Sequence, residues 1–373
     1  MNILARFTLI IIGLTINLFV ISCQNTTSSV DYTPPQLMSD KISTAPVKAT
    51  PTLTRAATVA PIVNSKPDAV LTTATMTPEI LTAVANLFPT ETPQATATRV
   101  TSISVNGRNQ PLVSGHPQSY LEQYRLVAFY GHPATPELGI LGELPREQLV
   151  TDLQKTAVTY QQSGWTSYEV KPTIHFISSV ANSDAGIDGM YRQQTELAVI
   201  TEWIHFASLH DLAFIIDIQP GQAELMEEFA RIRPLLYSPH VHLAIDPEFI
   251  MENNEIPGQT LGHIDANTIN QIQAQLNDIA LDIGLNKVLI VHQFEPDMIQ
   301  NKMQIQDYPY VELLIDADGF GAPTTKLADY LQYAQEAGWE YGGLKLFRHW
   351  DQPILTPAEV QILFPLPALI IYQ

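Results

Sequence analysis

The feature of this 373-residue chain that most limits its fold is a regular alternation of short apolar runs with amphipathic stretches, from about residue 120 to the end. The apolar runs are Leu126–Tyr130, Thr173–Ser178, Leu212–Asp217, Val241–Asp246, Val288–His292, Val311–Asp316, Leu344–Phe347 and Ala368–Tyr372. Runs of this length between turn signals suit buried strands. Strict alternation of strands and helices predicts a parallel sheet, and eight units predict a closed (β/α)8 barrel.

The stretches between the runs have helical periodicity, most clearly in Arg146–Gln162 and Thr268–Ile283, where the apolar residues share one helical face. The other predicted helices are Tyr191–Leu209, Ala223–Leu236, Lys326–Ala337 and the short Pro296–Lys302. No helix follows the last run, so we expect either that Gln118–Gln123 covers the gap or that the barrel is distorted there. An open, doubly wound sheet is the alternative. It is disfavoured because no glycine-rich phosphate loop follows the first strand.

Charge is distributed unevenly along the chain. Residues 1–115 hold 5 acids and 7 bases, whereas the remainder holds 33 acids and 12 bases, a net charge of −21. So negative a surface repels phosphate backbones, which argues against a nucleic-acid partner.

The N-terminus is typical of an export signal. Arg6 supplies the charged region, and Phe7–Ile21 form an apolar run that is short for a membrane span. The tetrad Val20–Cys23 then resembles the lipobox of bacterial lipoproteins, which implies cleavage before Cys23 and its lipidation. Cys23 is the chain's only cysteine, which excludes intramolecular disulfides. An uncleaved anchor helix is the alternative, and both place the rest of the chain outside the cytoplasm, at the cell envelope.

Thr, Ser and Pro make up about two-fifths of the residues from Gln24 to Gly115. Little of this segment can bury a core, so we interpret it as a disordered tether. The predicted organisation is a signal peptide over 1–22, a Thr/Ser/Pro-rich tether over 23–115 and one barrel domain over 116–373. The domain has the usual length of a (β/α)8 barrel, roughly 250 residues.

The segment Val241–Phe249, VHLAIDPEF, carries the most informative side chains. If it is a strand, Val241, Leu243 and Ile245 face the helices, and the alternate residues, including Asp246 and Glu248, face the barrel interior. Both acids then lie at the strand's C-terminal end, where (β/α)8 enzymes carry their active sites.

The same alternation places polar side chains at the C-terminal ends of the other strands. They are Tyr130, His132, His175, Ser179, Asp217, Gln219, His292, Gln293, Glu295, Asp316, Asp318, Lys345, Arg348, Trp350 and Asp351. One such acid often only caps a helix or starts a turn, but four strands end in an acid or acid pair. Carboxylates so close together raise one another's pKa values, which favours one protonated acid beside an ionised one.

The same residues suggest two further chemistries. Lys345 is either the counter-charge of the acids or, less simply, a Schiff-base lysine. The histidines His132 and His292 with nearby acids suit a divalent metal, but no HxH or HExxH spacing marks a dedicated site, so we predict no metal and no cofactor. His240 and His242 begin a strand, at the end remote from catalysis, and we interpret them as structural.

Several short motifs occur in a characteristic order: FYGHP, the segment Leu138–Glu143, IDIQPG, DPE, HQF and DGFG. On these motifs, residues 125–373 resemble a group of secreted or lipid-anchored bacterial (β/α)8-barrel proteins of unassigned activity. The resemblance implies the fold and no particular reaction.

Asp246 and Glu248 also match the D-x-E motif, and on it the chain is distantly similar to lysozyme-type and chitinase-like glycoside hydrolases. The resemblance implies that Glu248 is the general acid and that Asp246 orients it. Two departures are Pro247 between the acids and the absence of the longer chitinase motif, since Val241, Leu243 and Ala244 stand where acids are expected.

The resulting hypothesis is an extracytoplasmic lipoprotein that cleaves a glycan of the cell envelope, such as peptidoglycan, or of the environment. The predicted catalytic residues are Glu248, Asp246, Asp217 and Asp316, and the predicted substrate-binding residues are Tyr130, His132, Gln219, His292, Gln293, Asp318, Lys345 and Trp350. Two alternatives are a non-catalytic barrel that binds glycan or another envelope component, and a metal-dependent hydrolase.

Overall fold

The structure is a computed structural model that describes residues 117–165 and 167–373. The predicted signal peptide, the lipidation of Cys23 and the predicted tether all lie outside the described residues. In the described part of the chain, no helix is long and apolar enough to cross a membrane.

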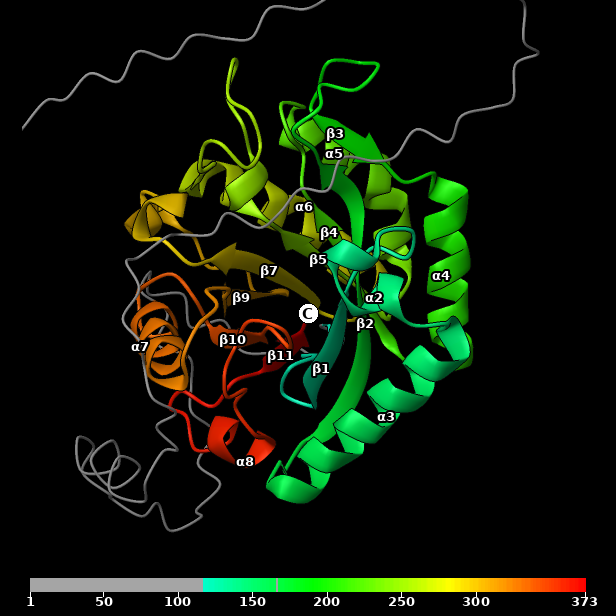
Figure 1. Ribbon diagram of the computed structural model, residues 1–373, viewed down its shortest axis with the longest axis vertical. Helices are drawn as coiled ribbons and strands as arrows, with labels where there is room; N and C mark the ends of the chain where they lie inside the picture. The colour runs from blue at the N-terminus through cyan, green and yellow to red at the C-terminus, as the bar shows by residue number, and fades with distance from the viewer. Residues whose placement is uncertain (1–116, 166) are drawn as a thin grey trace, which may run out of the picture. The chain divides into compact units, whose positions relative to one another are not determined.

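Eight parallel strands close into a barrel, as the alternation of apolar runs predicts (Figure 1). They are β1 (Tyr124–Gly131), β2 (Glu169–Ala181), β4 (Ala213–Ile218), β5 (Val241–Ile245), β7 (Lys287–Gln293), β9 (Val311–Ala317), β10 (Tyr341–Leu346) and β11 (Leu369–Tyr372). Each pairs with the next along the chain, and β1 pairs with both β11 and β2. This last pairing closes the sheet and excludes the open, doubly wound alternative.

The two faces of each strand meet different surroundings, as β5 illustrates. Val241, Leu243 and Ile245 belong to the apolar core between strands and helices, whereas Ala244 belongs to a second core inside the barrel. The predicted alternation is therefore confirmed on this strand. The same alternation on the other strands directs their inward polar residues towards the axis of the barrel.

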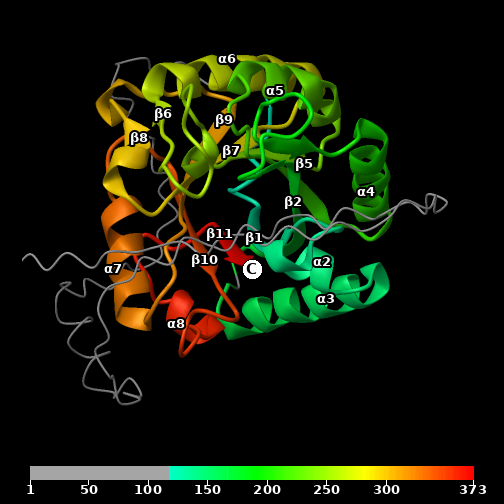
Figure 2. The same cartoon turned by 45° about the horizontal axis from the view of Figure 1, so that its top comes forward.

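Helices surround the strands (Figure 2). They are α2 (Ile140–Glu143), α3 (Arg146–Ser163), α4 (Leu197–Leu209), α5 (Leu225–Ile232), α6 (Ala266–Ile283), α7 (Pro323–Tyr333) and α8 (Pro357–Val360), with 3-10 turns η1 (Pro136–Leu138), η2 (Arg233–Tyr237), η3 (Pro247–Phe249), η4 (Pro296–Met298) and η5 (Lys302–Gln304). Amphipathicity explains the long ones, since the buried residues of α6 recur at helical spacing from Ile269 to Ile279.

Two predicted helices differ from the structure. The helix predicted over Tyr191–Leu209 begins only at Leu197, because Arg192–Gln194 form β3, which pairs antiparallel with the end of β2. The short helix predicted over Pro296–Lys302 is the single turn η4 followed by β8 (Ile299–Gln300), which pairs with β6 (Ile264–Asp265). In both places backbone pairing with a neighbouring strand overrides local helical preference.

The entering segment Gln118–Gln123 closes the amino-terminal end of the barrel rather than the position of the absent eighth helix. Gln118 pairs with Leu285, just before β7, and the ring of Tyr120 lies 4.2 Å from that of His242 at the start of β5. Tyr120 and Leu121 are buried in the interior core.

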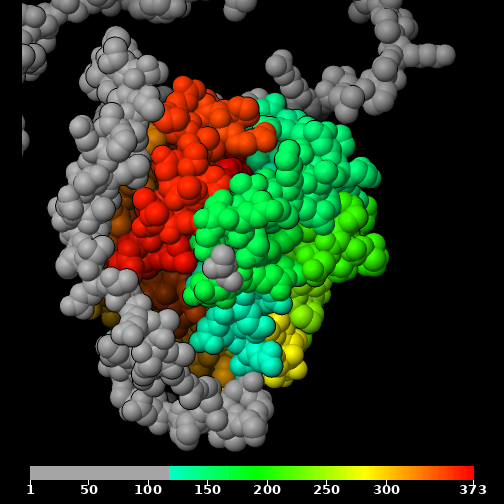
Figure 3. Space-filling model, turned by 90° about the horizontal axis from the view of Figure 1, so that it is seen from below, coloured from blue at the N-terminus to red at the C-terminus, as the bar shows by residue number. Residues whose placement is uncertain are grey.

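On the outer side of β11, α3 contacts the C-terminal region, and Figure 3 shows green atoms from the first part of the domain against the red atoms of the C-terminal part. Gln361, beside α8, donates to the Tyr160 carbonyl of α3 at 2.8 Å. The hydroxyls of Tyr160 and Tyr372 lie 2.9 Å apart. The barrel is thus closed without an eighth helix.

Candidate functional site

Six inward side chains form one buried group at the carboxyl ends of the strands. They are His175 (β2), Asp217 (β4), His292 (β7), Asp316 (β9), Asp318 just after β9, and Lys345 (β10). We call this group the carboxylate–histidine cluster. Its members come from five strands far apart in sequence, and each is at most 8% exposed.

His292 is the centre of the cluster. Its Nδ1 lies 3.0 Å from Asp316 Oδ2 and 3.2 Å from Asp318 Oδ2, and its Nε2 lies 3.2 Å from Asp217 Oδ2. On the other side of Asp217, the same Oδ2 atom is 3.2 Å from His175 Nε2. Burial lowers the pKa of His292, but Asp217, Asp316 and Asp318 more than offset this and hold it well above its ordinary value.

Lys345 pairs with one end of the cluster. Its Nζ lies 2.9 and 3.0 Å from the two carboxylate oxygens of Asp318 and 4.0 Å from the centre of the Tyr130 ring. Burial lowers the Lys345 pKa, but the charges of Asp318, Asp246 and Asp316 raise it overall, so the ammonium is retained. Such a lysine is a counter-charge and not the neutral amine that Schiff-base chemistry needs.

Gln219, just beyond β4, holds Asp246 and also contacts Tyr130, whose ring faces Lys345 of the cluster. Its Nε2 lies 3.2 Å from the Tyr130 hydroxyl and 3.3 Å from Asp246 Oδ2, and its Oε1 accepts from Ala181 N at 3.3 Å. Because both ends of the amide are engaged, the carboxyl of Asp246 is held in one orientation.

Asp246 and Glu248 leave the strand in a tight turn. Strand β5 ends at Ile245, and Glu248 lies in η3, which Asp246 caps: Glu248 N donates to Asp246 Oδ1 at 3.1 Å. The expectation that strand alternation continues to Glu248 is therefore wrong, because Pro247 starts a 3-10 turn. Asp246 is 3% exposed, whereas Glu248 is partly exposed.

The acids of the site divide into two protonation classes. Burial raises the pKa of Asp246 to about 7 and that of Glu248 to about 8, with further contributions from neighbouring carboxylates. Asp217 and Asp318 are equally buried, but His292 and His175 lower the pKa of Asp217, and Lys345 and His292 lower that of Asp318. The site therefore holds protonated acids next to ionised ones, which general acid catalysis requires.

An exposed aromatic pair lies on the loops that follow β9 and β10. Phe320 and Trp350 are 39% and 51% exposed, and their rings lie 6.2 Å apart. Asp351 holds the two loops that carry them, because it accepts from Gly321 N and Phe347 N, each at 2.8 Å. Buried Lys326 adds to this by donating to the carbonyls of Gly319 and Lys345.

Two predicted substrate-binding residues lie apart from the cluster. His132 contacts Thr135 and Thr195 at 3.2 and 3.1 Å, and its ring packs on that of Phe176, which belongs to the outer core. Gln293 is buried and donates to the carbonyls of Glu295 and Pro296. The geometry gives neither side chain a contact with the cluster.

The structure adds three residues to those predicted for the site. His175 was expected to face inward but was assigned no role, and it contacts Asp217 directly. Lys326 and Asp351 form the support of the loops after β9 and β10, at 3.8 Å from each other. Strand alternation identifies His175, but no sequence signal identifies Lys326, because it lies on α7 and only the fold brings it to the strand ends.

Metal ligation is geometrically open to part of the cluster. Two groups of three side chains each bring their ligand atoms within 4.8 Å of one another, namely His175, Asp217 and His292, and His292, Asp316 and Asp318. No sequence spacing marks them, because each ligand comes from a different strand or strand end.

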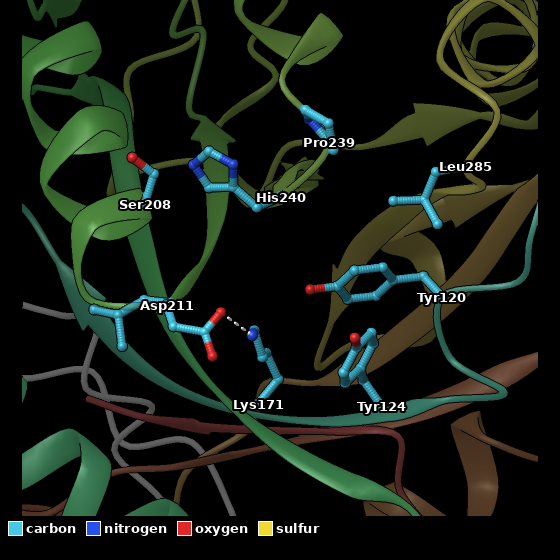
Figure 4. Close-up of a pocket in the computed structure, with 9 residues that line it drawn as sticks. Tyr120, Tyr124, Lys171, Ser208, Asp211, Pro239, His240 and Leu285 are labelled. Atoms are coloured by element: carbon cyan, nitrogen blue, oxygen red, sulfur yellow. Dashed lines mark hydrogen bonds and ion pairs between the residues drawn. The ribbon is translucent and has the colours of Figure 1, made fainter.

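A separate hollow of about 220 Å³ lies at the opposite, amino-terminal end of the barrel (Figure 4). Tyr120, Tyr124 and His240 line it, and Lys171 pairs with Asp211 across it at 2.5 Å. None of the predicted site residues lines this hollow.

Comparison with known proteins gives no family assignment. No family model and no curated protein matches the chain. Among solved structures, a weak similarity is found to a GH5-4 broad specificity endoglucanase from an uncultured bovine rumen ciliate, with 12% identity and a TM-score of 0.28. The match covers 54% of this chain and 58% of that chain. The barrel assignment rests on the strand pairing, and the family resemblance drawn from the motif order stays a prediction.

Proposed function

We propose that this protein is a glycoside hydrolase that acts on a cell-envelope or environmental glycan, with Glu248 as the general acid. The observation that carries the proposal is the arrangement of Glu248 and Asp246 at the mouth of the barrel. Glu248 is partly exposed, whereas Asp217 and Asp316 are wholly buried beneath it. The acid that a substrate can reach is thus the one whose pKa, about 8, keeps it protonated at neutral pH.

The arrangement suits glycosidic bond cleavage in two ways. Glu248 can donate its proton to the leaving oxygen, and the ionised carboxylate of Asp318, which also acts on the pKa of Glu248, can help to stabilise the positive charge of an oxocarbenium-like transition state before water adds to the sugar. Asp246, fixed by Gln219, orients Glu248 through its backbone N–H and helps to raise its pKa. Phe320 and Trp350 offer flat apolar surface to a sugar ring.

The experiment is to measure the turnover of a panel of neutral glycans and peptidoglycan by the full chain and by Glu248→Gln. The substitution removes the transferable proton and keeps the side-chain shape, so turnover should fall by at least about a hundredfold while sugar binding is retained. Glu252→Gln is the matched control, because Glu252 lies in the same loop and its side chain is 73% exposed. Full activity of Glu248→Gln on a substrate that the parent cleaves would refute the assignment.

A non-catalytic, glycan-binding barrel is the second candidate, and the burial of Asp246 favours it. Gln219 and the backbone of Glu248 already occupy this carboxyl, which is only 3% exposed. On this alternative the parent binds a glycan of the panel without turnover, and Glu248→Gln binds it equally well.

We further propose that the protein acts outside the cytoplasm and is anchored to a membrane by lipid on Cys23. The support is the order of charged region, apolar run and single cysteine in residues 1–23. Cys23→Ser should move the protein from the membrane fraction to the soluble fraction of expressing cells. Complete retention of the serine variant in membranes would contradict the lipid anchor and favour an uncleaved helix.

A further inference from the structure

One ring nitrogen at the centre of the carboxylate–histidine cluster has no hydrogen-bond partner among the described residues. Nε2 of His292 lies 3.2 Å from Asp217 Oδ2, but the direction of the ring nitrogen does not make this contact a hydrogen bond. The side chain is completely buried. Buried polar atoms nearly always have partners, so an unpaired one calls for a partner outside the protein chain, such as a water molecule or an ion.

The second ring nitrogen of His292, Nδ1, is hydrogen-bonded to a carboxylate. Nδ1 of His292 is hydrogen-bonded to Asp316 Oδ2 at 3.0 Å, and because a carboxylate only accepts, Nδ1 is the donor. Nε2, on the opposite edge of the ring, faces Asp217 Oδ2 and has no hydrogen-bond partner among the described residues. A histidine anchored by a carboxylate through one nitrogen, with the other nitrogen free, is the usual arrangement of a metal ligand.

Two further possible ligand atoms lie beside Nε2 of His292. Nε2 of His175 donates a hydrogen bond to Oδ2 of Asp217 at 3.2 Å, and the three atoms lie within 4.8 Å of one another. Ligand atoms that each lie about 2.0–2.2 Å from one ion are separated from one another by distances in this range. An ion bound between the three atoms takes the place of the proton of His175. Two imidazoles and one carboxylate favour a first-row transition metal ion over Ca²⁺ or Mg²⁺.

The charge of the cluster supports the same conclusion. The carboxylates of Asp217, Asp316 and Asp318 are buried together, and Lys345 is the one lysine that pairs with this group among the described residues. A divalent ion at Nε2 of His292 compensates the excess of negative charge, which is strongly destabilising in a buried place.

We propose that His175, Asp217 and His292 bind one first-row divalent metal ion such as Zn²⁺, with Asp316 as the outer partner of His292. The alternative group, His292 with Asp316 and Asp318, is disfavoured because Lys345 already pairs with both oxygens of Asp318 and His292 turns its donor nitrogen to that side. The ion displaces the proton of His292 on binding. The metal site can be tested separately from the proposed general acid, because neither Glu248 nor Asp246 is a ligand.

The test measures metal content and binding of the full chain. Protein produced with added Zn²⁺ or Co²⁺ is dialysed, analysed for bound metal and, for Co²⁺, examined for the visible bands of a histidine-ligated ion. We expect one ion per chain, and a higher melting temperature with Zn²⁺ than with chelator. Ca²⁺ and Mg²⁺ should give neither effect. Absence of bound Zn²⁺ and Co²⁺ in folded parent protein overturns the proposal.

Variants locate the ion. Asp217→Asn and His175→Gln should weaken binding at least tenfold, whereas His240→Gln, a partly buried histidine outside the cluster, should bind as the parent does. Asp318→Asn should keep the ion. Loss of binding in Asp318→Asn with retention in Asp217→Asn contradicts the ligand set.

Two measurements keep the test decisive. If a ligand variant fails to fold, the melting shift of the parent with Zn²⁺ against Ca²⁺ still decides whether a selective site exists. Glu248→Gln should bind the ion at the parent's stoichiometry even though it loses turnover. Failure of the metal site and failure of the general acid are therefore separate results.

Discussion

Neighbouring aspartates of the same barrel are held in opposite protonation states by their immediate partners. Asp217 and Asp246 end adjacent strands and are both buried. Asp217 lies between two imidazoles and its pKa is lowered, whereas Asp246 is hydrogen-bonded to an amide and a backbone N–H, neither of them cationic, and burial raises its pKa to about 7. Position on the barrel alone therefore does not define the role of an acid.

The raised pKa of Glu248 makes a prediction for stability. Its pKa is about 8 in the folded protein against an ordinary value of 4.5, so the folded state binds the proton more tightly than the unfolded state. The free energy of unfolding should therefore fall as pH rises between these values, by at most about 1.4 kcal/mol per pH unit from this group. Glu248→Gln should remove that part of the slope and be more stable than the parent at pH 8.

Denaturant unfolding of the parent, Glu248→Gln and Glu252→Gln at several pH values checks this. The control Glu252→Gln should keep the parent's slope, because Glu252 is solvated. An unchanged slope in Glu248→Gln would show that its carboxyl is not buried against like charge.

At the scale of the element, the strands could be predicted from the sequence far better than the turns and side-chain contacts around them. The eight strands and the inward direction of Asp217, Asp246 and Asp316 could be predicted from the sequence. Few other structures produce short apolar runs in which alternate residues face opposite sides. The position of Glu248 could not be predicted in this way, because Pro247 and the cap from Asp246 end the strand and form the turn η3. The pairings of Lys326 and His175 depend on which strands and helices become neighbours, and local sequence does not contain that.

A second element, the segment that enters the barrel, depends on Glu312 of β9. This buried carboxylate accepts from the Ser119 hydroxyl, and from Tyr120 N and Leu121 N at 3.0 and 2.9 Å. Glu312→Gln turns an amide NH₂ towards these donors, so one of them loses its acceptor. We expect a loss of about 1–3 kcal/mol in stability.

We call the hydrogen bonds from Ser119, Tyr120 and Leu121 to Glu312 the clamp. The melting temperatures of Glu312→Gln and Glu122→Gln, compared with that of the parent, test its role. Glu122 is exposed in the same segment, and its variant should melt as the parent does. Equal melting temperatures for all three proteins would mean that the segment is held by Tyr120 and Leu121 packing alone.

At the scale of the whole molecule, the described residues form a complete closed barrel with its own two cores. A chain starting near Ser114 should therefore fold and unfold in one cooperative transition, with the melting temperature of the full chain within a few degrees. Circular dichroism of both chains is the measurement. Failure of the shorter chain to fold would place part of its core before residue 114 and move the predicted domain boundary.

The clamp at Glu312 and the acids of the site lie at opposite ends of the same strands. Tyr120 enters beside the start of β5, and Asp246 follows its last residue, a strand length of roughly 17 Å away. Tyr120 and Leu121 are buried in the interior core, so they fill the barrel at the end where the chain enters it. A ligand of the acids therefore approaches from the other end, past the partly exposed Glu248, and substitutions in the entering segment should change stability without changing ligand specificity.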